Sequence, residues 1–281
     1  MQKILALIKI IRPLNSIMMG LGVCFSELIA LKFFPPYYVM LNGFLSGFFL
    51  TASSMVINDI YDYEVDMINA PHRPIPSGYI KIWEAKIYCA LLLFLGFLSA
   101  SLINMYCFFI AIITFVISLA YNAYFKKVGL IGNFMVSFCV AIPFIFGAYA
   151  VGKSRELLSF FSLIAFLVNT GREIIKTISD VEGDVKRGIR SVAYVYGPKF
   201  ASKLAVIFFV PALILIFIPV LYGWVSWLYL PIITISAIGL IGESLTILKM
   251  VNVEIAINVK KRILLYMLIA LVAMFIGGYY G

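Results

Sequence analysis

The chain has 281 residues, of which 63% are hydrophobic and only 12% are charged. Because soluble domains have roughly 25% charged residues, this composition and the mean hydropathy of +1.06 exclude an ordinary soluble protein. The formal net charge of +9 indicates contact with acidic head groups or acidic substrates, and the lack of a basic–aromatic motif argues against nucleic-acid binding.

Nine apolar segments follow one another along the chain, each close to the ~20 residues that an α-helix needs to cross a bilayer. They are Leu14–Leu31, Val39–Ile57, Ile87–Asn104, Cys107–Ala123, Leu130–Ala150, Leu157–Ile175, Leu204–Leu221, Trp227–Leu248 and Ile263–Tyr279. Alternating ten-residue stretches, which would indicate a β-barrel, are absent. We therefore predict an all-α polytopic membrane protein, a bundle of nine transmembrane helices in a single domain over residues 1–281. The apolar start has no small-residue cleavage site, so no removed signal peptide is expected.

The connections between these segments alternate in charge. The short ones contain three basic residues, Lys32, Lys153 and Arg155, whereas the polar ones contain eighteen. The polar set comprises the N-terminus and residues 58–86, 124–129, 176–203 and 249–262. Because basic residues are retained on the cytoplasmic side of membranes, we predict a multi-pass cell-membrane protein whose N-terminus and polar connections are cytoplasmic. Nine spans then place the C-terminus outside.

The second apolar segment ends in a dense acidic stretch, NDIYDYEVDMINAPHRPIPSG, at residues 58–78. Within it, Asn58, Asp62 and Asp66 are four residues apart, so on a helix they lie along one face. Placing a carboxylate in a membrane helix costs free energy, and carboxylates that lie close together repel one another. Taken alone, this spacing fits either a set of functional ligands or ordinary polar residues that cap a helix.

The sixth apolar segment ends in a second acidic pair, within REIIKTISDVEGDVKRG at residues 172–188. Asp180 and Asp184 are again four residues apart, at the same predicted membrane face, and basic residues and a glycine follow. Four carboxylates directed into one cavity are stabilised if divalent cations neutralise them. We therefore predict that the two pairs face each other and that Asp62, Asp66, Asp180 and Asp184 bind metal.

The available ligands favour a hard ion such as Mg²⁺ over a soft one. The chain has one histidine, His72, and four cysteines that lie singly in apolar segments, whereas carboxylate oxygens are abundant. Mg²⁺ held in this way commonly binds a diphosphate, and Lys126, Arg172 and Lys176 are placed to complete an anion site. With an apolar bundle behind it, the site suits a diphosphate joined to a long hydrocarbon, whose ionisation Mg²⁺ and basic residues promote.

These motifs resemble those of the UbiA-type intramembrane prenyltransferases. The resemblance rests on Asn58-x3-Asp62-x3-Asp66, on Arg73-Pro74-Ile75-Pro76-Ser77-Gly78 and on Asp180-x3-Asp184. It covers essentially the whole chain and implies Mg²⁺-dependent transfer of a prenyl group from an isoprenyl diphosphate donor to an acceptor. It also implies the catalytic residues Asn58, Asp62, Asp66, Asp180 and Asp184.

Within that family, residues 11–20, 58–78 and 171–184 are most similar to archaeal digeranylgeranylglyceryl phosphate synthases. This resemblance implies transfer of a geranylgeranyl group to geranylgeranylglyceryl phosphate, a lipid-phosphate acceptor, in ether-lipid synthesis. It places Asn15 in the pocket wall and Arg73, Lys126, Arg172 and Lys176 near phosphate groups. Two departures fall in the segment that is expected to form a loop over the cavity after the sixth apolar segment. They are Thr177, where an acidic residue is expected, and Arg190-Ser191-Val192, where a threonine-leucine-proline run is common.

Two other functions remain open from the sequence. One is a prenyltransferase with an aromatic acceptor, as in quinone or haem side-chain synthesis, and the other is an ion-coupled transporter. Transporter sites tend to lie at the membrane midplane, whereas both acidic pairs lie at one predicted face, which disfavours transport.

Residues 67–83 and 185–200 are expected to form cytoplasmic cap loops over the cavity. Glu243, inside the eighth segment, is expected either to be functional or to pair with a polar group of a neighbouring helix.

Overall fold

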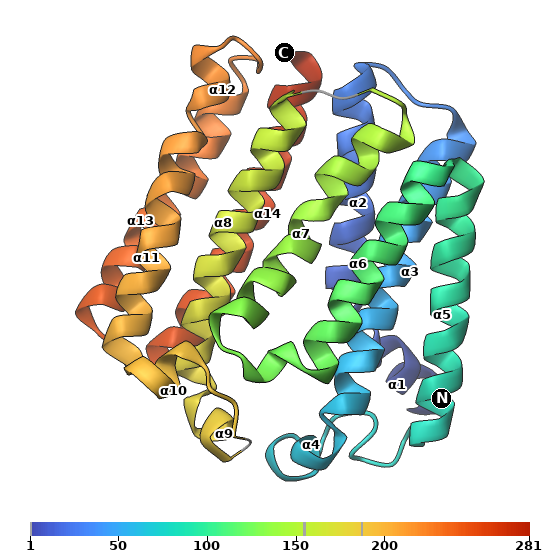
Figure 1. The fold of residues 1–281 in the computed structure, drawn as a ribbon. Helices are drawn as coiled ribbons and strands as arrows, with labels where there is room; N and C mark the ends of the chain where they lie inside the picture. Colours follow the sequence, from blue (N-terminus) through green and yellow to red (C-terminus); the bar gives the residue numbers. More distant parts are fainter. Residues whose placement is uncertain (1, 154–155, 187) are drawn as a thin grey trace. The chain divides into compact units, whose positions relative to one another are not determined.

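The computed structural model describes residues 2–153, 156–186 and 188–281 (Figure 1). Met1, Ser154, Arg155 and Arg187 lie outside the described residues, and of these Arg155 and Arg187 contributed to the predicted charge asymmetry. Every regular element in the described part of the chain is a helix. Nine of the described helices are long and apolar enough to span a membrane. The predicted all-α, nine-helix membrane architecture is therefore confirmed.

The helices fit the apolar segments with a few differences at their ends. They are α1 (Gln2–Ile10), α2 (Pro13–Leu31), α3 (Tyr37–Tyr61), α4 (Tyr63–Asn69), α5 (Ile82–Ile103), α6 (Met105–Ala123), η1 (Phe125–Lys127), α7 (Leu130–Ala150), α8 (Glu156–Ser179), α9 (Val181–Lys186), α10 (Val192–Tyr196), α11 (Pro198–Leu215), α12 (Ile218–Leu221), α13 (Tyr229–Lys249) and α14 (Val253–Tyr280). The N-terminal helix α1 was not predicted. The last helix begins ten residues earlier than expected, so Lys260, Lys261 and Arg262 are helical and do not lie in a loop.

The chain divides into two compact units, Met1–Tyr124 with Phe146–Lys153, and Phe125–Ile145 with Ser154–Gly281. We call them unit 1 and unit 2 and describe each separately. Helix α7 contributes its first part to unit 2 and its last turn to unit 1. That residues 1–281 form a single functional domain stays a prediction.

In unit 1, α3 packs against α2, α5 and α6. Where α2 and α3 meet, a Cβ atom on Gly47 would lie 3.1 Å from the carbonyl oxygen of Met19 and 3.2 Å from the Cα of Gly20. Small residues of this kind let the backbones of membrane helices approach closely. Near the other end of α2, the side chain of Glu27 is buried, and a Cβ on Gly43 would overlap its Oε1 atom. The packing of α2 and α3 therefore depends on glycines in both helices.

In unit 2, α8 packs against α11 and α14, and α13 packs against α14. The core of the unit contains Ile174, Phe209 and Ile263, all fully buried. Glu243 of α13 forms a bidentate pair with Arg262 of α14, at 2.6 Å to Nε and 2.8 Å to Nη2. Glu243 therefore pairs with a polar group of a neighbouring helix, which is one of the two roles expected for it.

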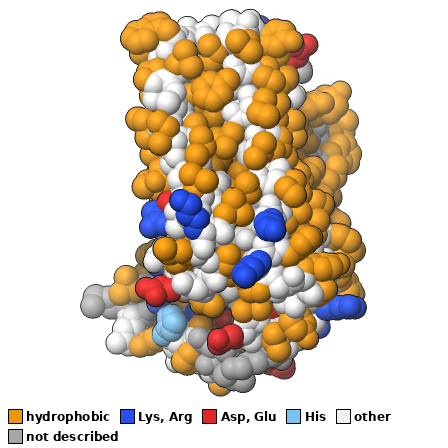
Figure 2. All heavy atoms as spheres, turned by 90° about the vertical axis from the view of Figure 1, so that its left-hand side faces the viewer, with side chains coloured by type: hydrophobic (Ala, Val, Ile, Leu, Met, Phe, Trp, Pro, Cys, Tyr) orange, Lys and Arg blue, Asp and Glu red, His pale blue; other side chains and the backbone are white. Residues whose placement is uncertain are grey.

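The outer surface of unit 2 is that of a membrane protein. Hydrophobic side chains cover most of the face that includes α11 and α13, and lysine and arginine side chains gather toward the end at which α9 and α10 lie (Figure 2). The exposed hydrophobic residues there include Ile207, Ile214, Ile238 and Leu245. Such a band is expected where helices contact lipid.

Candidate functional site

The first acidic motif lies at a junction between two helices of unit 1. Helix α3 ends at Tyr61, Asp62 follows, and the short helix α4 begins at Tyr63. The backbone N–H of Asp62 donates to the carbonyl of Asn58 at 2.9 Å, and that of Asp66 donates to Asp62 at 2.8 Å. The four-residue hydrogen-bond pattern of a helix therefore continues through the junction. This continuity gives Asn58, Asp62 and Asp66 the helical spacing that the sequence predicted.

Both aspartates of this junction are buried and hydrogen-bonded. The side chain of Asn58 donates from Nδ2 to Oδ2 of Asp62 at 3.1 Å. Asp66 is only 2% exposed, and Arg73 donates to its Oδ2 atom. Burying a carboxylate is costly unless it is paired. The pairing with Arg73 meets this requirement, so Arg73 lies at the carboxylates of its own unit.

Two residues that the sequence analysis did not select complete this group. Asp59 is 4% exposed and accepts a hydrogen bond from Nη2 of Arg12 at 2.9 Å. It also lies 3.7 Å from Nη1 of Arg73. Arg12 is held at the start of α2 in a left-handed conformation with φ of 46°, immediately before Pro13. The basic residues before α2 and after α4 are thus joined through one buried carboxylate.

The second acidic motif has the same construction in unit 2. Helix α8 ends at Ser179, Asp180 follows, and the short helix α9 begins at Val181. The N–H of Asp180 donates to the carbonyl of Lys176 at 3.1 Å, and that of Asp184 donates to Asp180 at 2.9 Å. Asp184 is 9% exposed. In both units a long membrane helix thus ends at one aspartate, and a helix of seven or six residues carries the second.

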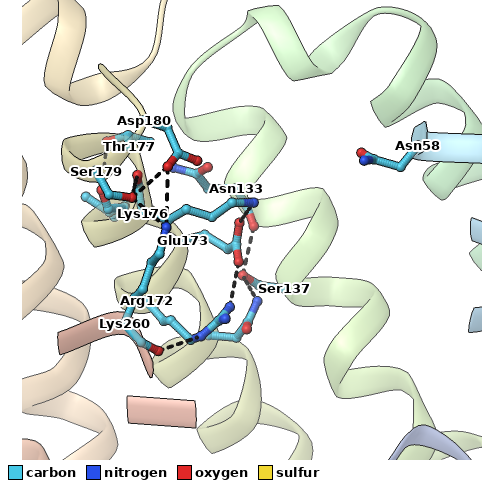
Figure 3. Close-up of polar contacts among 12 residues, drawn as sticks. Asn58, Asn133, Ser137, Arg172, Glu173, Lys176, Thr177, Ser179, Asp180 and Lys260 are labelled. Atoms are coloured by element: carbon cyan, nitrogen blue, oxygen red, sulfur yellow. Dashed lines mark hydrogen bonds and ion pairs between the residues drawn. The ribbon is translucent and has the colours of Figure 1, made fainter. Parts of the chain in front are cut away.

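The basic residues of α8 are held by an acidic residue that lies between them. Glu173 is 6% exposed, and its two carboxylate oxygens accept from Nη1 of Arg172 at 2.8 Å and from Nζ of Lys176 at 3.2 Å. From α14, Lys260 donates from Nζ to Oγ of Ser179 at 2.7 Å and lies 3.4 Å from Oδ1 of Asp180 (Figure 3). Neither Glu173 nor Lys260 is among the site residues predicted from the sequence.

The remaining predicted residues lie in more open positions. Asn15 is half-buried in the first turn of α2, and Lys126 is half-buried in η1. His72, the one histidine of the chain, is exposed. The roles assigned to Asn15 and Lys126 stay predictions.

Thr177, which was expected in the loop over the cavity, lies instead in the last turn of α8 and has a structural role there. The N–H of Ala193, at the start of α10, donates to Oγ1 of Thr177 at 3.3 Å. Ser191, at the N-cap position of α10, makes no side-chain capping bond. Thr177 of α8 therefore supplies the acceptor that a helix N-terminus requires. It attaches the segment after α9 to the end of α8.

The donor set at the two junctions is chemically suited to a hard divalent cation. It consists of carboxylate and amide oxygens, which such ions prefer. Among the described residues, no three His, Cys, Asp or Glu side chains lie close enough to hold a metal ion by themselves. Each junction contributes two of the predicted metal ligands, and further ligands have to come from water, phosphate or the other junction. Because the junctions belong to different units, their separation stays a prediction.

Comparisons with known proteins identify relatives over nearly the whole chain. The profile of the UbiA prenyltransferase family matches residues 20–254. Digeranylgeranylglyceryl phosphate synthase of Methanocaldococcus jannaschii is 37% identical over 99% of this chain and 97% of its own length. The enzyme of the same name from Thermococcus sibiricus is 35% identical over 96% of each chain.

Solved structures of proteins with the same family or enzyme name have a similar fold. A structure from work on digeranylgeranylglyceryl phosphate synthase in membranes is 36% identical, with a TM-score of 0.82 and complete coverage of both chains. A UbiA homologue from Archaeoglobus fulgidus, bound to GPP and Mg²⁺, is 21% identical with a TM-score of 0.64, over 96% of this chain and 99% of that one. At this lower identity the likeness concerns the fold alone.

Proposed function

Because the chain belongs to the UbiA prenyltransferase family, we propose that it transfers a geranylgeranyl group from geranylgeranyl diphosphate to geranylgeranylglyceryl phosphate. The products are digeranylgeranylglyceryl phosphate and pyrophosphate. The proposal is supported by the name of the relatives that match nearly the full length. The observation that carries it is the repeated junction, in which each of two membrane helices ends at an aspartate and a short helix adds a second.

The reaction requires the bond between the prenyl carbon and the diphosphate oxygen to break, with both electrons leaving on pyrophosphate. A hydroxyl oxygen of the acceptor then bonds to the allylic carbon and loses its proton. When bound, a divalent cation neutralises the departing pyrophosphate. Asp62, Asp66, Asp180 and Asp184 would hold it, with Asn58 fixing the orientation of Asp62 through the hydrogen bond to Oδ2.

The basic residues act on the phosphate groups. Arg172 and Lys176 are positively charged donors at the end of α8, and Arg73 lies at the carboxylates of the first junction. Charge-assisted hydrogen bonds from such residues orient an anion and stabilise the negative charge that develops on it. The apolar helices would hold the prenyl chains and exclude water from the allylic cation.

The metal and the side of the membrane belong to the same proposal. We assign Mg²⁺ as the cation because the donors are oxygens and the ligand is a diphosphate. The protein is a multi-pass membrane protein, and the proposed site faces the cytoplasm, as the distribution of basic residues predicts.

A direct assay tests the assignment. Purified protein with Mg²⁺ and geranylgeranyl diphosphate is offered geranylgeranylglyceryl phosphate or 4-hydroxybenzoate in parallel, and the products are identified by mass spectrometry. We expect prenylation of the lipid phosphate only, and loss of turnover when EDTA removes the metal. Prenylation of 4-hydroxybenzoate alone would assign an aromatic acceptor, and turnover that persists in EDTA would exclude the metal-dependent mechanism.

A further inference from the structure

Three cations lie together in unit 2, around the end of α8. Arg172 and Lys176 come from α8 itself, and Lys260 comes from α14. Arg172 donates from Nε to the backbone carbonyl of Lys260 at 3.3 Å, while the ammonium group of Lys260 reaches Ser179 and Asp180 (Figure 3). The side chain of Lys260 therefore runs along the stretch of α8 that leads to the second acidic junction.

Metal binding at the acidic junction would change the contacts of this group. Arg172 and Lys176 contact Glu173, whereas Lys260 contacts Asp180. In the proposed function Asp180 is a metal ligand, so its charge would be shared between Lys260 and the metal. A phosphate group, which as a monoester carries about −1.5 to −2 at neutral pH, would supply negative charge to Lys260.

Lys260 is the cation with the weakest carboxylate contact. Its shortest contact is the neutral hydroxyl of Ser179 at 2.7 Å, and Asp180 lies farther away at 3.4 Å. Its side chain is only 22% exposed. An ammonium group withdrawn from water in this way favours an additional anion.

Glu173 sets the positions of the other two cations. One of its oxygens binds Arg172 and the other binds Lys176, and the carboxylate itself is buried. Arginine and lysine side chains lose much rotamer entropy when they are immobilised. Because Glu173 fixes them before substrate binds, this cost does not oppose binding.

We propose that Arg172, Lys176 and Lys260 form a binding site for a substrate phosphate group, and that Glu173 is the positioning residue that organises it. The proposal rests on the proposed function and adds Lys260 and Glu173 to it. The phosphate belongs either to the acceptor lipid or to the donor diphosphate. Both sources share the same chemistry, and binding measurements with separate probes distinguish them.

The test compares two variants with two matched controls. Glu173→Gln removes the positioning charge, and Lys260→Met removes the third cation. Lys261→Met removes the exposed charge next to Lys260 on α14, and Glu254→Gln removes an exposed carboxylate of the same helix. Equilibrium binding of inorganic pyrophosphate with Mg²⁺, and of geranylgeranylglyceryl phosphate, is measured on each detergent-solubilised protein, together with the KM for each substrate and kcat.

We expect Glu173→Gln and Lys260→Met to weaken the binding of one probe by about tenfold or more, with a matching rise in the KM of that substrate. The kcat value should change much less, and both controls should bind as the original protein does. A loss confined to the lipid phosphate assigns the site to the acceptor, and a loss confined to pyrophosphate assigns it to the donor.

Unchanged binding of both probes in the two variants, with only a lower unfolding temperature, would overturn the proposal and leave Glu173 a structural residue. Equal losses in the Lys261→Met control would also overturn it, because general surface charge would then explain them. If Glu173→Gln does not fold, Lys260→Met decides alone, since its side chain is partly exposed. Pyrophosphate binding needs no turnover, so failure of the acceptor assay does not affect this test.

Discussion

Asp62 lies at the point where α3 gives way to α4, with its carboxylate accepting a hydrogen bond from Asn58. Asp62→Asn retains the size and the hydrogen bonding but removes one negative charge from the proposed metal ligands. We expect turnover to fall by about two orders of magnitude or more with any acceptor, because the diphosphate has to ionise in every case. The measurement is steady-state turnover as a function of Mg²⁺ concentration.

Glu64→Gln is the matched control for this prediction, since Glu64 is exposed on α4 two residues away. It should leave turnover and the metal dependence nearly unchanged. Normal turnover of Asp62→Asn at limiting Mg²⁺ would contradict the assignment of the first junction.

Glu27 shows a different consequence of burial. It is fully buried in unit 1, and within the described residues neither carboxylate oxygen has a hydrogen-bond partner. Burial without a partner costs free energy, so an apolar side chain of similar length is expected to be tolerated or stabilising. We predict that Glu27→Met raises the free energy of unfolding by about 1–3 kcal/mol.

Thermal unfolding in detergent measures this change, with Glu27→Gln as the comparison that retains a polar group of the same shape. We expect Glu27→Gln to stay close to the original protein. A clear decrease in stability for both variants would mean that the carboxylate is satisfied by a water or an ion.

At the scale of elements, a hydrogen bond between side chain and backbone joins α10 to α8, in addition to the packing of Val192 and Ala193 against α8. Thr177→Val has nearly the same shape but leaves the N–H of Ala193 without its acceptor. We expect a loss of about 1 kcal/mol in the local stability of α10, seen as roughly fivefold faster amide exchange in residues 192–196. Thr177→Ser, which keeps the hydroxyl, should restore the original exchange rate. Equal exchange in all three proteins would show that this bond does not hold α10.

The predicted cap loops also differ in their internal structure. Residues 185–200 contain the helix α10 and the start of α11, so this segment is not a plain loop. Residues 67–83 contain the end of α4, a series of turns and the first residues of α5. That the two segments cover one cavity stays a prediction, because they belong to different units.

At the scale of the whole molecule, the proposed mechanism requires the two acidic junctions to share one metal–diphosphate site. We predict that the carboxylates of Asp62 and Asp66 lie roughly 5–12 Å from those of Asp180 and Asp184, a span that metal ions and a diphosphate bridge. A cryo-EM structure with Mg²⁺ and a prenyl diphosphate measures these distances. Junctions on opposite faces of the protein would refute a shared site.

The orientation in the membrane is tested with single cysteines. Tyr79→Cys and Tyr222→Cys place thiols at exposed positions in a polar and a short connection, respectively. We expect a membrane-impermeant maleimide to label Tyr79→Cys only in inside-out vesicles and Tyr222→Cys only in right-side-out vesicles. The unsubstituted protein is the control, because Cys24, Cys89 and Cys107 are buried and Cys139 lies within α7. The opposite labelling pattern would place the active site outside the cell.

The properties that the sequence determined by itself are local ones. Hydropathy over about 20 residues identifies membrane helices because the thickness of the bilayer sets their length. The four-residue spacing of Asn58, Asp62 and Asp66 was readable because one helical turn brings such residues onto the same face. The structure confirms that spacing by continuing the backbone hydrogen bonds through the junction. Family membership was also readable, since the same motifs carry it.

Only the tertiary structure decided which distant residues meet. Lys260 lies 80 residues from Asp180 in the chain, yet it contacts that carboxylate because α14 packs against α8. Arg12 meets Asp59 in the same way, across the packing of unit 1. No local pattern encodes such contacts, because they depend on how helices pack and on which long side chains can reach a buried charge. Once the helices are in contact, a buried charge without a partner would be destabilising, so oppositely charged side chains within reach pair with it.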